Sequence, residues 1–404
     1  MQEQILTARR IAEYRQWLTQ RNIAELEKLA GQLKGKKIYE INATAIGGGV
    51  VELLQSQVPL MMGLGLDAHW LVLPPDERFF TITKQFHNAL QGGRDDPPDD
   101  IEYYDEYTQQ VAKTLPRDGD IYILHDPQTL GFIPFLAGKT VIWRCHIDLT
   151  NAEPRTLAWV RRRLRSVQTS IFSLQSYTAG MPKTAIVYPS IDPLAPKNQP
   201  MARAEAEKVL QRHGIKADQP IVTQISRYDR FKDPLGVLEI CELVRQKIPQ
   251  LQCVLLGNYA TDDPEGSVVY EEVVKAAGDI PNTFLIVNAK DNDELVNALQ
   301  SRADVVVQNS NREGFGLTVT EAMWKRALVC GRPVGGIVLQ IKNRRTGLYF
   351  NGSHEADAKI LARALETEGL RDRLGRAAHE IVERQFITPV MLADYLKAYV
   401  AAAT

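Results

Sequence analysis

Residues 303–330 carry the sequence ADVVVQNSNREGFGLTVTEAMWKRALVC, and this stretch decides how the rest of the chain is interpreted. Asp304–Gln308 is a short β-branched run, which predicts a buried parallel strand. Asn309–Gly316 is polar and contains two glycines, so we expect a loop, and Leu317–Lys325 has the composition of a helix. A strand, a glycine-containing loop and a helix N-terminus together form a site for an anion, because backbone N–H groups there lack partners.

Two carboxylates stand in this segment, Glu313 before the helix and Glu321 within its first turns. Gly314 and Gly316 lie between them, and glycine lets a backbone approach a ligand closely. The pattern favours a phosphate-bearing ligand whose hydroxyls meet carboxylates. Thr318 followed three residues later by Glu321 is also a capping box, so a purely structural role for Glu321 is the alternative.

The bulk composition is that of an ordinary globular protein. A length of 404 residues predicts two or three domains, with 44% hydrophobic and 24% charged residues. A net charge of −1 argues against nucleic-acid binding. Four scattered cysteines without a C-x-x-C pair predict neither a metal framework nor disulfides, so we expect a cytoplasmic protein. We expect no secretory signal, because the N-terminus has no continuous apolar region, and no transmembrane segment, because no apolar run reaches 18 residues.

Alternating strand and helix patterns predict an α/β protein with two doubly wound, Rossmann-like domains facing across a cleft. The proline-rich residues 189–200 indicate a linker. We therefore expect domains at residues 1–193 and 194–385, with a C-terminal helix in 386–404 packing back on the first. The predicted strands are 37–42, 69–73, 120–125, 140–146, 170–174 and 185–188, then 221–226, 252–256, 283–287, 304–308 and 328–330. The predicted helices include 11–17, 23–33, 50–62, 101–115, 154–166 and 389–402.

Two features of the first half indicate a ligand site at the carboxyl ends of its predicted strands, where ligands bind in open α/β sheets. Gly47–Gly49 stand before a predicted helix, which suits close approach by a sugar or phosphate, although a tight turn explains them equally well. The G-x-G-x-x-G spacing of nicotinamide-cofactor sites is missing. His125 and His146 end neighbouring predicted strands, and each is followed by an aspartate within two residues. We interpret these histidines as candidates for chemistry, with a structural role as the alternative.

Basic residues occur at two places of interest. Arg227 and Lys232 follow the first strand of the second half, from which both could reach one diphosphate. Their alternative role is that of ordinary surface cations. The arginine cluster at residues 161–165 is expected to be a solvated helix face, with a membrane-surface patch as the alternative.

The Arg227-x4-Lys232 pair, the Glu313-x7-Glu321 motif and two doubly wound domains resemble the retaining nucleotide-sugar transferases of glycosyltransferase family 4, which have GT-B architecture. Longer strings bring the resemblance closest to the trehalose glycosyltransferring synthase branch: INATAIGGGV, FHNALQG, HDPQ, WRCHIDL, DDPEG and EGFGLTVTEAMWK. The resemblance covers nearly the whole chain. It implies reversible transfer of glucose from ADP-glucose or UDP-glucose to glucose, giving trehalose. A trehalose or other glucoside phosphorylase, a family 4 transferase with another small acceptor, and a non-catalytic binding module are the alternatives.

The resemblance implies a role for each matching position. Arg227 and Lys232 would bind the donor diphosphate and stabilise it as it leaves. Glu321 would bind the ribose, Glu313 would hold the hydroxyls of the transferred sugar, and His146 would lie beside that sugar. The catalytic set is thus Glu313, His146, Arg227 and Lys232. Further donor contacts are implied at Gly48, Gly49, Asn288, Gly314, Phe315, Gly316, Leu317 and Thr318, and acceptor contacts at His125 and Asp148.

The family often has glycine directly after the motif lysine, whereas Asp233-Pro234 follows here, which we expect to change the backbone freedom of that loop. Enzymes of this kind need no catalytic metal, so the resemblance implies no cofactor beyond the nucleotide sugar itself. The expected partners are that donor and a sugar acceptor, with no nucleic acid. A homo-oligomer is left open, and so is the nucleotide base.

Overall fold

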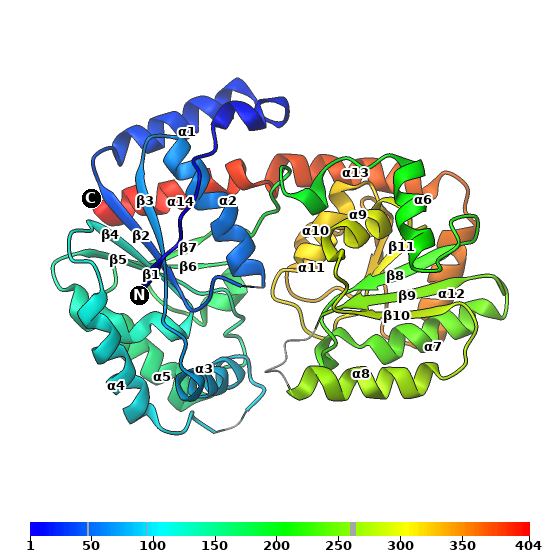
Figure 1. Cartoon of the computed structure of the whole chain (residues 1–404), viewed down its shortest axis with the longest axis horizontal. Helices are drawn as coiled ribbons and strands as arrows, with labels where there is room; N and C mark the ends of the chain where they lie inside the picture. Colours follow the sequence, from blue (N-terminus) through cyan, green and yellow to red (C-terminus); the bar gives the residue numbers. More distant parts are fainter. Residues whose placement is uncertain (47, 95, 259–263) are drawn as a thin grey trace. The chain divides into compact units, whose positions relative to one another are not determined.

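The computed structural model describes residues 1–46, 48–94, 96–258 and 264–404. The chain forms two compact units, one of Met1–Ser190 with Thr388–Thr404 and one of Ile191–Ile387. Each unit is a parallel sheet with helices on both faces, as the strand–helix alternation predicts (Figure 1). Gly47 of the glycine triplet lies outside the described residues. Within them, none of the helices has the length and apolar composition that crossing a membrane requires.

The sheet of the first unit has the strand order β1-β3-β2-β4-β5-β6-β7 and is parallel except for β1, which runs antiparallel to β3. In register, Ile41 lies opposite Leu71 of β3 and Leu124 of β4. Every residue of β4 is buried, which explains its uninterrupted apolar sequence. The strands are β1 (Gln2–Glu3), β2 (Lys37–Asn42), β3 (Asp67–Val72), β4 (Ile121–His125), β5 (Thr140–Arg144), β6 (Thr169–Phe172) and β7 (Thr184–Ile186).

Helices cover both faces of this sheet. One layer holds α1, α2 and α14, and the other holds α3, α4 and α5 (Figure 1). The C-terminal helix α14 packs on α1, α2 and β5, so the end of the chain belongs to the first unit. The α-helices are α1 (Gln20–Gln32), α2 (Gly49–Gly63), α3 (Glu77–Leu90), α4 (Ile101–Val111), α5 (Pro154–Arg163) and α14 (Thr388–Ala403). Short 3₁₀ helices occupy Ile11–Trp17, Ala112–Thr114, Pro127–Leu136, Leu164–Ser166 and Gln175–Thr178.

The second unit has a fully parallel sheet in the order β10-β9-β8-β11-β12-β13. Its strands are β8 (Ile221–Ile225), β9 (Gln252–Gly257), β10 (Thr283–Val287), β11 (Val305–Gln308), β12 (Val329–Gly331) and β13 (Leu348–Tyr349). Its α-helices are α6 (Arg203–Arg212), α7 (Pro234–Arg245), α8 (Pro264–Ala277), α9 (Asn292–Arg302), α10 (Leu317–Trp324), α11 (Ile337–Gln340), α12 (His354–Glu366) and α13 (Leu370–Gln385). Pro196–Asn198 and Arg230–Lys232 are 3₁₀ turns.

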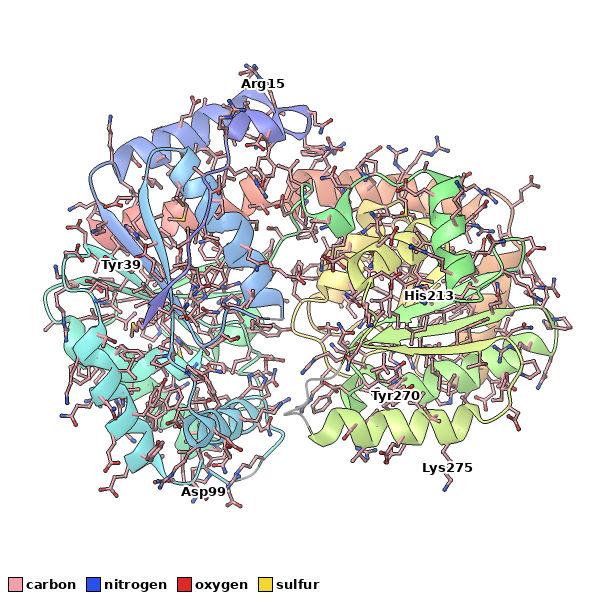
Figure 2. All side chains as sticks on the ribbon, in the orientation of Figure 1. Arg15, Tyr39, Asp99, His213, Tyr270 and Lys275 are labelled. Carbon is pink, nitrogen blue, oxygen red and sulfur yellow. The ribbon has the colours of Figure 1, made fainter. Side chains whose placement is uncertain are left out.

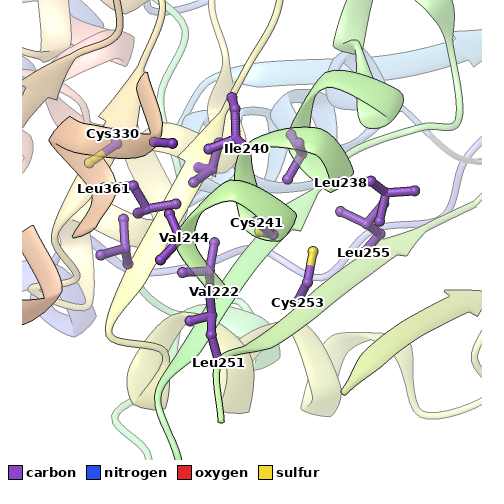
Figure 3. Close-up of a cluster of buried hydrophobic side chains, with 14 of the residues drawn as sticks. Val222, Leu238, Ile240, Cys241, Val244, Leu251, Cys253, Leu255, Cys330 and Leu361 are labelled. Carbon is purple, nitrogen blue, oxygen red and sulfur yellow. The ribbon is translucent and has the colours of Figure 1, made fainter. Parts of the chain in front are cut away.

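One apolar cluster fastens α7 and α12 to this sheet (Figure 3). It includes Val222 of β8, Leu255 of β9, Val244 of α7 and Leu361 of α12, all at most 2% exposed. Burial of this kind contributes about 1.5–3 kcal/mol for each large aliphatic side chain. The outer helix α8 shows the usual division of faces, since Tyr270 packs edge-on against Tyr228 at 4.9 Å while Lys275 points to solvent (Figure 2).

Two expectations need correction, and a third is confirmed with the helix type now specified. The helix predicted at residues 11–17 is a 3₁₀ helix over Ile11–Trp17, and Tyr14 within it is fully buried. The proline-rich stretch is not a free linker, because Ile191 pairs with Ile387 and the carbonyl of Asn198 accepts a hydrogen bond from the Trp324 indole at 3.0 Å. The cluster at residues 161–165 is partly engaged, since Arg163 pairs with Asp105 and Arg161 donates to a backbone carbonyl.

Candidate active site

The loop between β11 and α10 is closed by a glycine in a conformation that other residues rarely adopt. Gly316 has φ +85° and is the N-cap of α10. A Cβ there would lie 3.3 Å from Cγ of Glu313, so the loop needs both the backbone freedom and the space of glycine. The N–H groups of Leu317 and Thr318 have no acceptor within the described residues. Such free N–H groups are what an anion site at a helix N-terminus needs, and anion binding here stays a prediction.

Lys232 and Glu313 meet at this loop. Nζ of Lys232 lies 2.7 Å from Oε2 of Glu313, and the two side chains are only 15% and 9% exposed. The same carboxylate oxygen accepts from Gln308 Nε2 at 3.1 Å and from Ser310 Oγ at 3.3 Å. Three donors on one oxygen hold the Glu313 carboxylate in a fixed orientation beside a cation.

Arg227 is placed differently. Its side chain is 62% exposed and its Nη2 lies 3.1 Å from Asp229 Oδ2. The structure brings Lys232 to Glu313 but gives Arg227 no direct bond to either residue. Shared binding of one diphosphate by Arg227 and Lys232 therefore stays a prediction.

Asp233 follows Lys232 directly in the sequence. It adopts φ +48°, the left-handed region that glycine favours. Its Oδ1 accepts from the backbone N–H of Gly236 and so caps α7, while its Oδ2 accepts from Asn309 and Arg332, both at 2.9 Å. Aspartate tolerates this region when its side chain is bonded locally, and the effect of Asp233 on the backbone freedom of the loop stays a prediction.

Glu321 is not part of a capping box. The helix begins at Leu317, so Thr318 lies inside it, and its hydroxyl donates to Gln308 Oε1 at 3.1 Å. Glu321 is 2% exposed and pairs instead with Nζ of Lys197 at 2.6 Å, with Gln300 Nε2 at 3.4 Å from its other oxygen. The nearly buried Glu321 carboxylate, paired with Lys197, is consistent with a binding role. It has no capping role, because Gly316 is the N-cap of α10.

Two lysines near Glu321 were not predicted from the sequence to belong to the site. Lys197 lies in the proline-rich stretch, where no periodicity marked it. Lys325 follows α10 and donates to Gln300 Oε1 at 2.7 Å and to Asn198 Oδ1 at 3.1 Å. Burial lowers the pKa of Lys325 to about 7, although the nearby Glu321 opposes that shift. Only the tertiary contact between residues 197–198 and α10 reveals this group.

The other predicted donor positions lie around the same sheet edge. Asn288 follows β10 with φ +49°, and its N–H donates to the carbonyl of Gly257. Phe315 is 6% exposed and packs edge-on against Phe386 at 5.5 Å. The carbonyl of Gly314 accepts from the N–H of Gly336, where a Cβ would lie 2.5 Å from Cα of Phe315. Gly336 therefore fixes the loop through close backbone contact.

The first unit brings its two predicted histidines together. Nδ1 of His125 lies 2.9 Å from Nε2 of His146, and Nε2 of His125 lies 2.8 Å from Oε2 of Glu40. His125 is 3% exposed and Glu40 is fully buried, whereas His146 is partly exposed. Burial, followed by the nearby Arg144 guanidinium, holds the pKa of His146 well below its usual range, so its ring is neutral. Sequence patterns gave no signal for Glu40, which occupies an ordinary strand position.

The remaining predicted positions of the first unit are loop residues. Gly48, with φ +80°, is the N-cap of α2, and Gly49 begins that helix. Asp148 accepts from the backbone N–H of Thr150 at 2.8 Å in a local turn. Asp126 accepts from the N–H of His146 at 2.7 Å, and burial raises the pKa of Asp126 to about 6. Acceptor roles for His125 and Asp148 stay predictions, and both ring nitrogens of His125 are already engaged.

Within the described ranges, no group of three or more His, Cys, Asp or Glu side chains could hold a metal ion. The groups that converge at the second sheet edge are a helix N-terminus, a lysine and two carboxylates. They can bind a diphosphate together with sugar and ribose hydroxyls.

The fold and this site define a glycosyltransferase of the GT-B class. Residues 40–179 match the model of the trehalose synthase N-terminal domain, and residues 205–381 match that of group 1 glycosyl transferases. Trehalose synthase of Rubrobacter xylanophilus is 37% identical, covering 96% of each chain. That of Pyrococcus horikoshii is 36% identical over 96% of this chain and 95% of its own. The chain belongs to the trehalose synthase family.

More distant proteins share the architecture. Trehalose phosphorylase of Grifola frondosa is 26% identical, over 91% of this chain but 58% of its own length. A crystal structure of Anabaena HepE with UDP-glucose superposes with a TM-score of 0.69 at 18% identity, covering 89% of this chain and 98% of that one. A trehalose-phosphate synthase of Burkholderia xenovorans gives 0.72 at 16% identity, covering 91% and 100%. At such identities these structures support the fold alone.

Proposed function

We propose that this glycosyltransferase moves glucose from a nucleoside diphosphate glucose to free glucose, with retention at the anomeric carbon, and forms trehalose reversibly. Family membership over 96% of the chain supports trehalose as the product. The observation that carries the nucleotide-sugar donor is the Lys232–Glu313 pair at the N-terminus of α10, with Glu321 in the same helix. A cytoplasmic location fits the four free cysteines.

The proposed chemistry follows from the charges that develop as the bond between sugar and diphosphate breaks. Negative charge grows on the leaving oxygens, and Lys232, Arg227 and the N–H groups at the start of α10 would stabilise it. Positive charge grows on the sugar, whose hydroxyls Glu313 would hold in place. Glu321 would bind the ribose, so that the donor is fixed at two points before the reaction.

Retention then needs no enzymic nucleophile. The acceptor would attack from the side of the leaving group, and the departing phosphate would take the acceptor's proton. His146 of the first unit would contact the transferred sugar. The proposed reaction uses no metal, since the cations that neutralise the diphosphate are supplied by Lys232 and Arg227.

Phosphorolysis of trehalose is the second candidate, because trehalose phosphorylases are among the relatives. In that reaction inorganic phosphate replaces the nucleotide, and Glu321 would have no ribose to bind. The trehalose synthase of Rubrobacter xylanophilus is 37% identical over 96% of each chain, against 26% identity over 58% of the phosphorylase, which favours the synthase reaction.

Product analysis by NMR tests the proposal. The enzyme is incubated with glucose and either ADP-glucose or UDP-glucose, and separately with trehalose and inorganic phosphate. We expect the α,α-linked anomeric signal of trehalose with at least one nucleotide sugar, and no glucose 1-phosphate from the phosphate reaction. Glucose 1-phosphate formation without nucleotide would establish the phosphorylase instead. Transfer to another polyol with no transfer to glucose would overturn the acceptor assignment.

A further inference from the structure

A buried chain of hydrogen bonds leads to His146 from the side away from solvent. Its innermost member is Glu40 of β2, which is fully buried. Oε1 of Glu40 accepts from Tyr399 Oη at 2.6 Å and from Gln57 Nε2 at 2.9 Å. Oε2 lies 2.8 Å from Nε2 of His125. Glu40 therefore accepts hydrogen bonds from three groups, as a carboxylate does.

This arrangement determines where the protons of the two imidazole rings lie. Because Glu40 accepts, Nε2 of His125 carries a proton, and in a neutral ring Nδ1 is then an acceptor. With His125 neutral, Nε2 of His146, 2.9 Å from that Nδ1, donates to it. The two ring planes differ by only 11°, which suits a bond between edges of the rings. His146 is neutral, so its own Nδ1 is left as a bare acceptor.

The outward nitrogen of His146 is open to a ligand. Within the described residues no group bonds to it, and the ring is partly exposed. The backbone of the same residue is fixed by the bond from its N–H to Asp126 Oδ1 at 2.7 Å. Both the position and the proton arrangement of His146 are thus set by its neighbours.

We propose that Glu40, His125 and Tyr399 act as positioning residues that hold His146 in the Nε2–H tautomer and present its Nδ1 as an acceptor to a hydroxyl of the transferred sugar. The inference rests on the proposed function for its ligand, while the proton arrangement rests on the contacts of Glu40 and on two neutral rings. It gives the C-terminal helix α14 a role in the site, since Tyr399 is one of its residues. It also assigns His125 to a position between Glu40 and His146, where it does not contact the acceptor.

The test combines a direct measurement of the tautomer with kinetics. The full chain is labelled with ¹⁵N-histidine, and His146 is assigned by comparison with His146→Gln. Long-range ¹⁵N–¹H correlation spectra then show which nitrogen carries the proton. We expect Nε2 protonated and Nδ1 bare in the wild type, and a mixture of tautomers in Glu40→Gln, whose amide can donate to His125.

Transfer kinetics show whether the tautomer matters for the reaction. Glu40→Gln should lower kcat by about 10-fold to 100-fold, the usual cost of losing a group that orients a functional histidine, with little change in nucleotide KM. Tyr399→Phe removes one donor to Glu40 by a smaller change and should lower kcat in the same direction. Tyr107→Phe removes a hydroxyl of the first unit that donates to the carbonyl of Pro74 and to none of these residues, so both its spectrum and its kcat should match the wild type.

Each outcome has a distinct meaning. A wild-type His146 protonated at Nδ1 overturns the proton arrangement. A correct tautomer with undiminished kcat in both Glu40→Gln and Tyr399→Phe overturns the positioning role. If Glu40→Gln fails to fold, Tyr399→Phe decides. Failure of the wild type to use any nucleotide sugar overturns the proposed function, and the spectra still decide the proton arrangement independently.

Discussion

Nζ of Lys232 and Oε2 of Glu313 lie 2.7 Å apart, although 80 residues separate them in the chain. The contact joins the loop after β8 to the loop after β11, two strands that are neighbours in the sheet. Parallel strands bring their carboxyl ends to one edge, and so two motifs distant in sequence form one charged site. In the proposed reaction the two residues bind different parts of the donor: Lys232 binds the diphosphate, and Glu313 binds the sugar hydroxyls.

Replacing Lys232 by Met should lower kcat/KM for transfer by about 10²–10³-fold, since one preorganised charge at the leaving group contributes about 2.7–4 kcal/mol. Steady-state kinetics with the preferred nucleotide sugar give the number. Lys247→Met is the matched control, because Lys247 is an exposed lysine of the same unit whose side chain forms no ion pair within the described residues. Unchanged kcat/KM in Lys232→Met would remove the diphosphate role of this lysine.

Glu313→Gln keeps the size of the side chain but loses its charge. It should lower kcat by about 10²-fold, because the amide binds hydroxyls less strongly than a carboxylate and no longer balances Lys232. Nucleotide KM should change little, since Glu313 is assigned to the sugar. A rise in nucleotide KM with kcat intact would instead place Glu313 at the nucleotide.

Lys197→Met should destabilise the second unit by about 3 kcal/mol, because it leaves the nearly buried carboxylate of Glu321 without its closest cation. The double variant with Glu321→Gln should recover most of that loss, since the unpaired charge is then gone. Urea unfolding followed by the ¹⁹F signal of 5-fluorotryptophan at Trp324 isolates this unit, because Trp324 is the only tryptophan between residues 191 and 387. Additive losses in the double variant would show that the two side chains are not coupled.

Lys325 gives the second unit a pH-dependent stability. Its pKa is lowered to about 7 in the folded chain and is about 10.4 when unfolded. Between these values the unfolded chain binds more protons, so stability rises with pH from about 7 to 10, by at most about 1.4 kcal/mol per pH unit. Lys325→Met should flatten this slope in urea titrations at pH 7, 8 and 9. Lys247→Met should keep it, and an equally steep slope in Lys325→Met would contradict the assignment.

Activity should survive removal of divalent cations. Prolonged dialysis against EDTA is expected to leave kcat for transfer within about twofold of the untreated enzyme, because protein cations carry the charge compensation in the proposed reaction. A loss that Mg²⁺ or Mn²⁺ restores would show that a metal ion takes part.

Much of the fold was predictable because its strands are short apolar runs between turn residues. The predicted bounds Lys37–Asn42 and Thr283–Val287 coincide with β2 and β10, whereas Thr140–His146 ends two residues too late. That strand stops at Arg144 because the chain must turn to place the N–H of His146 on Asp126. The two-residue strand β1 gave no signal at all, since its exposed residues carry no apolar pattern.

The sequence motifs of the site could be predicted, but the residues that contact them could not. Glu313 and Lys232 were marked by spacing and glycines, and the structure brings them into contact. Lys197 and Glu40 carry no local signal, because each gains its importance only from a residue more than 80 positions away. The local sequence offered a capping box at Thr318 as the alternative. In the structure Gly316 is the N-cap, so Thr318 lies inside the helix.

A crystal structure of the enzyme with its nucleoside diphosphate tests the central claim most directly. We predict the β-phosphate within hydrogen-bond distance of Lys232 Nζ and of the N–H groups of Leu317 and Thr318, with the ribose hydroxyls on Glu321. A nucleotide bound away from the start of α10, with Lys232 and Glu321 untouched, would contradict the account.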